Sequence, residues 1–141
     1  MPTALITGIG GQDGSFLSEL LLEKGYRVVG TVPDDDPANI DRIQHLLNKV
    51  AIVRDDLLLQ DRIETIFRDH RPAEVYNFAA NSVLAASFLQ PLLATEVLAM
   101  GVTRILEAIR KITPEARFFQ ASSSEIFGKP TEIPQSETTP F

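Results

Sequence analysis

The sequence predicts an α/β fold in which a doubly wound parallel sheet lies between two layers of helices. Short apolar segments of strand length alternate with segments whose apolar residues recur at helical spacing. Successive strand segments are separated by enough residues to form the crossover connection that parallel strands need. A glycine-rich stretch also follows the first strand segment directly. Right-handed crossovers leave few topologies, and we expect the strand order 3-2-1-4-5 in a three-layer αβα arrangement.

The N-terminal segments predict a strand, a helix and a second strand. Thr3 to Thr7 is a short apolar run that Gly8 ends. Residues 15–24 have their apolar side chains at helical spacing, and Gly25 is a typical residue for a helix end. Residues 27–32 are again apolar and rich in valine, which predicts a strand.

The middle of the chain continues the alternation. Residues 33–39 form an acidic, turn-rich loop, and apolar residues between positions 40 and 47 predict a short helix. Residues 50–54 predict a third strand. The spacing of Ile63, Ile66 and Phe67 predicts a helix that ends before Pro72.

The remaining segments predict two strands around one long helix. Residues 74–78 and 117–121 are the strands, and residues 92–112 form an amphipathic helix. Residues 128–141 hold three prolines and many polar residues, which predicts a loop. We therefore expect a domain over residues 1–128 and a loop over residues 129–141.

Length and composition exclude several classes of function. The 141 residues suffice for one domain, and the 44% hydrophobic content is that of a globular protein. The net charge of −6 provides no basic surface for nucleic acid. The sequence has no cysteine, which excludes disulfides and thiolate metal sites. We expect no metal, no signal peptide before Thr3, no membrane span and a cytoplasmic location.

A glycine-rich loop between the first strand and the first helix carries the clearest functional signal. Gly8, Gly11 and Gly14 form a G-x-x-G-x-x-G pattern around Gln12 and Asp13. Glycines permit a tight turn and a close approach of backbone N–H groups to a pyrophosphate, which the helix N-terminus also attracts. The context therefore indicates a Rossmann-like, dinucleotide-binding domain. The alternative is an ordinary strand-to-helix turn.

The end of the second strand is where such a domain distinguishes NAD from NADP. A carboxylate there binds the ribose 2′-hydroxyl of NAD, whereas an arginine accepts the 2′-phosphate of NADP. The sequence offers Asp34, which lies 20 residues after Gly14, and it has no arginine in this loop. NAD is therefore reasonable. The alternative is a solvated acidic loop in which Asp36 caps the following helix.

Several segments together resemble the GDP-mannose 4,6-dehydratase family of the extended short-chain dehydrogenase/reductase superfamily. The matching segments are Gly8 to Ser15, Leu20 to Tyr26, Asp56 to Leu57, Tyr76 to Ala80, Ser87 to Pro91, Leu106 to Arg110, Gln120 to Glu125 and Ile133 to Phe141. The glycine loop alone indicates only the superfamily. The Gln-Asp-Gly-Ser run, the Ser-Glu pair and the last segment are similar to the dehydratases.

The resemblance implies a lyase that uses NADP to convert GDP-mannose to GDP-4-keto-6-deoxymannose by internal hydride transfer. It implies that Glu125 is the base that removes the C5 proton and that Ser123 supplies a hydroxyl beside it. We expect the Glu125 carboxylate to be partly buried at the end of the fifth strand. The implied cofactor-binding residues are Gly8, Gly11, Gln12, Asp13, Gly14, Asp56, Leu57, Ala79, Ala80, Ser82 and Ser122.

The sequence departs from the family pattern in three places. The chain ends at Phe141 without a Tyr-x-x-x-Lys motif, so we expect an N-terminal portion, truncated after the fifth strand, that is inactive alone. Pro33 and Asp34 replace arginines of the family. Asn81-Ser82-Val83 replaces a Gln-Ser-His segment.

Other interpretations stay open at this point. One is a catalytically dead NAD(P)-binding module, and another is an NAD-dependent nucleotide-sugar epimerase or dehydratase of the same superfamily. The apolar stripe of the long helix over residues 92–112 also predicts self-association, so we expect a homo-oligomer. For Ser122 to Ser124 the alternative is a polar strand exit whose hydroxyls bond nearby backbone.

Overall fold

The computed structural model describes residues 1–33, 37–55, 57–80 and 84–141 of the chain. Five parallel strands form one sheet with the order β3-β2-β1-β4-β5, which confirms the predicted topology. The strands are β1 (Thr3–Thr7), β2 (Arg27–Val32), β3 (Ala51–Arg54), β4 (Glu74–Asn77) and β5 (Arg117–Gln120).

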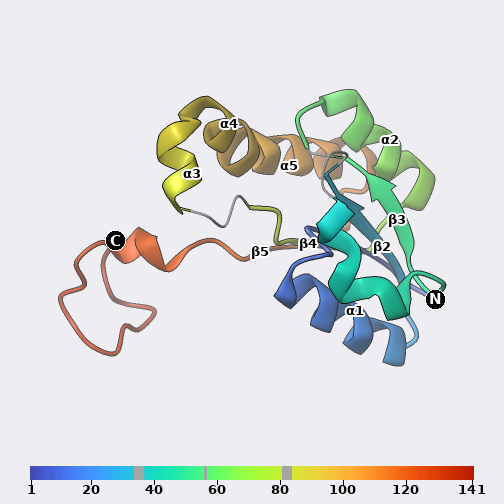
Figure 1. Cartoon of the computed structure of the whole chain (residues 1–141), viewed down its shortest axis with the longest axis horizontal. Helices are drawn as coiled ribbons and strands as arrows, with labels where there is room; N and C mark the ends of the chain where they lie inside the picture. The colour runs from blue at the N-terminus through green and yellow to red at the C-terminus, as the bar shows by residue number, and fades with distance from the viewer. Residues whose placement is uncertain (34–36, 56, 81–83) are drawn as a thin grey trace.

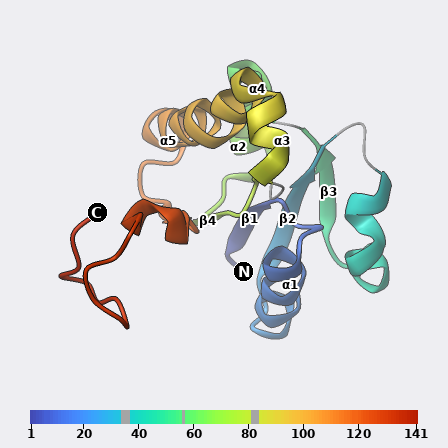
Figure 2. The ribbon, with the colours of Figure 1, turned by 60° about the vertical axis from the view of Figure 1, so that its left-hand side comes forward.

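Helices cover both faces of the sheet, as Figures 1 and 2 show. One face carries α1 (Gln12–Glu23) and the 3₁₀ helix η1 (Pro37–Leu46). The other face carries α2 (Gln60–His70), α4 (Pro91–Thr95), the π-helical segment η2 (Glu96–Met100) and α5 (Gly101–Ile112). Two short helices complete the set, α3 (Leu84–Leu89) and η3 (Ser124–Phe127).

The helix predicted over residues 92–112 differs from the observed segments in its hydrogen bonding. The helical path starts at Pro91 and passes through the wider π-helical turns of η2 before α5 begins. The short helix α3 was not predicted from the sequence. It ends before Gln90, whose φ of −133° is not helical, because a residue that precedes a proline is disfavoured in the helical conformation.

Two apolar layers hold the helices against the sheet. Between the sheet and α1 lie Ala4, Ile6, Ile9, Leu21, Val28, Val32, Ile43, Leu46 and Val50. Between the sheet and the α2–α5 pair lie Leu5, Val29, Leu57, Ile63, Ile66, Phe67, Val75, Ile105, Ala108 and Ile109. The alternation of Leu5 and Ile6 between the two layers is what a strand covered on both faces requires.

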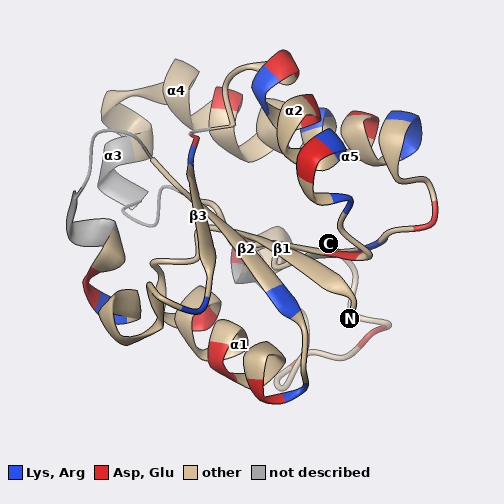
Figure 3. Ribbon diagram, turned by 90° about the vertical axis from the view of Figure 1, so that its right-hand side faces the viewer, with Lys and Arg blue, Asp and Glu red and all other residues tan. Residues whose placement is uncertain are grey.

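Charged side chains lie mainly on the helices, and the strands carry them mostly at their ends (Figure 3). Glu64 of α2 is charged but buried between the helices, with only 7% of its surface exposed. Its carboxylate accepts hydrogen bonds from Lys111 of α5 (3.1 Å) and from Gln60 (3.1 Å). These bonds hold the pKa of Glu64 below its ordinary value. The ion pair ties α2 to α5.

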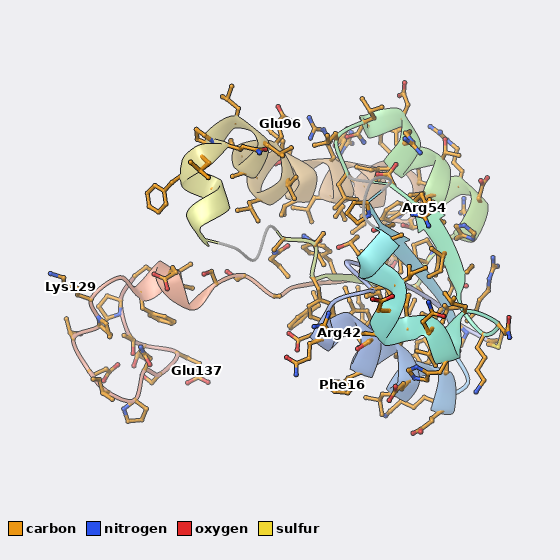
Figure 4. The ribbon with its side chains drawn as sticks, in the orientation of Figure 1. Phe16, Arg42, Arg54, Glu96, Lys129 and Glu137 are labelled. Atoms are coloured by element: carbon orange, nitrogen blue, oxygen red, sulfur yellow. The ribbon has the colours of Figure 1, made fainter. Side chains whose placement is uncertain are left out.

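Part of the apolar surface stays exposed. Leu92 is 83% exposed on α4 and Phe16 is 61% exposed on α1, where Figure 4 shows it on the side away from the sheet. Phe119 on the edge strand β5 is 50% exposed. The expected self-association stays a prediction. No helix within the described ranges is long and apolar enough to cross a membrane.

A polar cluster lies at the amino ends of β2, β4 and β5. Glu74 is 6% exposed, and it accepts hydrogen bonds from the hydroxyls of Tyr26 (3.0 Å) and Tyr76 (2.5 Å). Arg117 forms an ion pair with the same carboxylate. The hydrogen bond from Tyr76 is the main cause of the lowered pKa of Glu74. Burial and the bond to Glu74 raise the pKa of Tyr76 to about 12.

We expect both tyrosines to resist ionisation at a pH where free tyrosine is half ionised, about 10. The pKa of Tyr76 is raised on folding, so its contribution to stability is present below pH 10 and is lost as the pH rises toward about 12. Tyrosinate absorbance during an alkaline titration measures this, and Tyr76→Phe leaves Tyr26 as the only signal. Half-ionisation of both tyrosines near pH 10 in the folded chain would contradict the described cluster.

Candidate functional site

The glycine loop between β1 and α1 packs too tightly for side chains. Gly8 has a φ of +69°, and a Cβ built there would lie 3.0 Å from the carbonyl oxygen of Phe78. A Cβ on Gly14 would lie 2.5 Å from the carbonyl oxygen of Gly8 and 2.8 Å from the Cα of Ile9. Real Cβ atoms do not come as close to backbone as the one on Gly14 would, and the positive φ of Gly8 strains any residue with a side chain. The loop therefore depends on glycine at these two positions, and it lies directly against the residues that follow β4.

The first turn of α1 has no side-chain cap for its backbone N–H groups. Gly11 precedes the helix and has no side chain that could accept a hydrogen bond from the first turn. Its own N–H bonds the carbonyl of Gly8 at 3.0 Å, which closes the turn. Gln12 and Asp13 are exposed at the helix start. This geometry suits an anion such as a phosphate group, which the helix dipole also favours.

A buried carboxylate that sequence analysis missed organises the loop after β3. Asp55 is 2% exposed, and one of its oxygens accepts the N–H of Leu57 at 2.8 Å. Its other oxygen lies 3.2 Å from Nε of Arg62 on α2. The only feature of the sequence that could have indicated this residue is the pair of aspartates after the strand. The pair does not show that the Asp55 carboxylate is buried.

The predicted adenine contact falls on this same turn. Leu57 has a φ of 63° and is 3% exposed, so its side chain belongs to the core beneath the loop. Asp56, its predicted partner, lies outside the described residues, as do Asp34 and Ser82. The predicted roles of these residues stay predictions.

A cleft of about 400 Å³ opens at the carboxyl ends of β4 and β5. It brings together four predicted site residues that are far apart in sequence: Ala79 and Ala80 after β4, and Ser122 and Ser123 after β5. Leu98, Ala99 and Val102 of η2 and α5 form its apolar wall. The cleft lies beside the glycine loop, because Gly8 packs against the backbone of Phe78 and Ala79. In open α/β sheets, ligands bind at this edge of the sheet.

The end of β5 places the two predicted catalytic residues next to each other. Ser122 has a φ of 60°, and Ser123 accepts the N–H of Glu125 on its Oγ at 3.2 Å, which caps η3. Glu125 is exposed and does not line the cleft. The expectation of a partly buried carboxylate at Glu125 was therefore wrong for this chain, because no described residue packs over it.

A second cleft of about 430 Å³ lies at the opposite, amino end of the strands. It is bordered by the C-terminal half of α1 and by the cluster of Tyr26, Glu74, Tyr76 and Arg117. None of the predicted site residues lines it. The carboxyl-end cleft is therefore the candidate functional site.

Fold and site together define a Rossmann-like α/β domain with a glycine-rich loop beside a cleft at the carboxyl end of the sheet. The family model for GDP-mannose 4,6 dehydratase matches residues 5–141. The chain belongs to this family. It is 44% identical to a GDP-mannose 4,6-dehydratase of Vibrio cholerae over 98% of its own length, and 40% identical to the human GDP-mannose 4,6 dehydratase over the same share. It spans 39% and 40% of those two proteins.

Solved structures share the fold. The UDP-glucose 4-epimerase from Bifidobacterium longum, solved in complex with NAD+ and UDP, superposes with a TM-score of 0.85 at 24% identity. The match covers 98% of this chain and 42% of the epimerase. The Bordetella bronchiseptica enzyme WbmH, in complex with NAD+, gives a TM-score of 0.82 at 25% identity and covers 99% and 45% of the two chains.

Proposed function

We propose that this chain is the cofactor-binding N-terminal portion of a GDP-mannose 4,6-dehydratase, a lyase that converts GDP-mannose to GDP-4-keto-6-deoxymannose. The observation that carries the proposal is the glycine loop, in which Gly14 has no room for a Cβ and Gly11 leaves the start of α1 uncapped. Relatives named for this activity match nearly the whole chain. The solved neighbours that contain NAD+ have the same fold.

The residues of the chain fit a nicotinamide dinucleotide along the carboxyl edge of the sheet. The N–H groups at the start of α1 would hold the pyrophosphate, with Gly8, Gly11 and Gly14 allowing its approach. Asp34 would reach the adenosine ribose, and the turn at Asp56 and Leu57 would contact adenine. Ala79 and Ala80 would form the wall beside the second ribose and the nicotinamide. Ser82 would line the pocket, and Ser122 would be a further cofactor-binding residue.

The chemistry would take place at the end of β5. When bound, the nicotinamide would accept a hydride from C4 of the sugar and return it to C6, from which the hydroxyl group leaves as water. The Glu125 carboxylate would take the proton from C5. Ser123 uses an oxygen lone pair for the N–H of Glu125, so its own hydrogen stays available for a substrate oxygen. This hydrogen bond holds the Ser123 hydroxyl against the backbone of Glu125.

Turnover of GDP-mannose also requires a group that removes the O4 proton. The sequence has only Tyr26 and Tyr76, and neither is followed by lysine four residues later. Tyr76 also donates its hydroxyl to Glu74 in the cluster at the amino end of the sheet, and it does not line the carboxyl-end cleft. We therefore propose that the chain as given binds the cofactor without dehydrating the sugar.

Calorimetric titration with NADP(H) and then NAD(H) tests the proposal, and we expect binding of at least one of the two pairs. Tighter binding of NAD(H) would assign Asp34 to the ribose 2′-hydroxyl. Tighter binding of NADP(H) would show that the family preference persists despite this carboxylate. Binding of neither would contradict the proposed cofactor site.

A further inference from the structure

Three polar side chains lie side by side where the central strands end. Thr7, Asn77 and Gln120 are the last residues of β1, β4 and β5, and the strand register pairs Thr7 with Asn77 and Asn77 with Gln120. Thr7 is fully buried and Asn77 is 2% exposed, whereas Gln120 is exposed at the cleft. The three residues form one row that runs from the core into the candidate site.

Hydrogen bonds join this row in sequence. The backbone N–H of Ala79 donates to Oγ1 of Thr7 at 3.2 Å, and the Thr7 hydroxyl donates to Oδ1 of Asn77. Asn77 in turn donates through Nδ2 to Oε1 of Gln120 at 2.7 Å. Thr7 and Asn77 thus each receive one hydrogen bond and donate another, whereas Gln120 at the end of the row only receives one.

The direction of the row follows from its first donor. A backbone N–H can only donate, so the Thr7 oxygen accepts from Ala79 and its hydrogen must find another acceptor. If the Asn77 amide were turned over, its NH2 group would face Thr7 and the buried Thr7 hydrogen would lose that acceptor. An unsatisfied buried donor is costly. The Asn77 oxygen therefore faces Thr7, and the carbonyl of Gln120 faces Asn77.

The direction of the row also determines which group Gln120 presents to a ligand. Its carbonyl oxygen is used by Asn77, and within the described residues its NH2 group has no acceptor. We propose that Gln120 is a specificity-determining residue whose NH2 group donates a hydrogen bond to an oxygen of the ligand in the cleft. This inference rests on the proposed function. The oxygen belongs either to the nicotinamide-riboside end of the cofactor or to the sugar of the nucleotide-sugar substrate.

The direction of the amide can be tested without a ligand. We expect the side-chain NH2 protons of Gln120 to exchange with water as fast as those of the exposed Gln135, measured by NMR on the labelled chain. If both side-chain amides were turned over, the Gln120 NH2 group would donate one of its protons to Asn77, and that proton would exchange more slowly. Protection of the Gln120 protons relative to those of Gln135 would overturn the proposal.

The ligand contact is tested by Gln120→Glu, which keeps an oxygen for Asn77 and removes both donors. Calorimetry would use three separate probes. They are ADP, GDP-mannose, and whichever nicotinamide dinucleotide the wild type binds. We expect about tenfold weaker binding of one probe, since a hydrogen bond is lost and two oxygens face each other. Weaker dinucleotide binding with unchanged ADP binding places the oxygen on the nicotinamide-riboside end. Weaker binding of GDP-mannose alone places it on the sugar.

Gln44→Glu is the matched control, because it adds the same charge on exposed η1, on the opposite face of the sheet. Equal binding by Gln120→Glu and the wild type for every probe that the wild type binds would overturn the inference while leaving the proposed function intact. Failure of the wild type to bind any probe would overturn the proposed function and the ligand contact together, and proton exchange would still decide the direction of the amide.

Discussion

Gly14→Ala is expected to weaken dinucleotide binding at least tenfold and to lower the free energy of unfolding by about 1–3 kcal/mol. The added methyl group would lie 2.5 Å from the carbonyl oxygen of Gly8 and 2.8 Å from the Cα of Ile9. Both are backbone atoms, so α1 or the loop has to move. That movement shifts the N–H groups proposed to hold the pyrophosphate. Calorimetric titration and denaturant unfolding measure the two effects.

Gly101→Ala is the matched control for this substitution. Gly101 is also helical, and a Cβ there would lie 3.6 Å from its nearest neighbours, which is ordinary contact. Replacing a helical glycine with alanine stabilises by about 0.5–1 kcal/mol where there is room. We expect Gly101→Ala to be neutral or stabilising with unchanged binding. Equal changes in dinucleotide affinity and in the free energy of unfolding for Gly14→Ala and Gly101→Ala would contradict the tight packing of the loop.

Phe67→Ala is expected to lower the free energy of unfolding by about 3–5 kcal/mol, the usual cost of truncating a buried phenylalanine. Phe67 is fully buried between α2, the sheet and α5, where it packs among Leu5, Val75 and Ile105. Domains of this size are stable by about 5–15 kcal/mol, so the loss is a large part of the total. Urea unfolding followed by circular dichroism gives the value.

Phe88→Ala removes the same atoms from an exposed position. Phe88 is 80% exposed on α3, so its truncation is expected to change the stability by less than about 0.5 kcal/mol. A loss at Phe88 as large as that at Phe67 would show that the apolar core does not lie where the structure places it.

The sheet could be predicted from the sequence because each of its strands is a short apolar run. Thr3–Thr7 and Arg27–Val32 were predicted with their observed bounds. Helix type was harder to predict. The apolar spacing of residues 40–47 suits an α-helix, but the observed segment Pro37–Leu46 is a 3₁₀ helix, which differs in hydrogen bonds that the spacing does not encode.

The candidate site was predicted in part. The spacing of Gly8, Gly11 and Gly14 was informative because the loop packs against backbone, which leaves no room for a Cβ on Gly14 and holds Gly8 at a positive φ. The row that ends in Gln120 could not be foreseen, since it depends on the register between strands that are 43 or more residues apart. The exposure of Glu125 depends on which residues pack over it, and a local pattern does not contain that information.

The most direct test of the central claim is to follow the backbone amides by NMR while the nicotinamide dinucleotide is added. We expect the largest shifts on Gly11 to Gly14 at the start of α1, with further shifts at Ala79 and Ser122 in the cleft. Shifts confined to the amino-end cleft around Tyr26 and Arg117, or no shifts at the glycine loop, would contradict the proposed cofactor site.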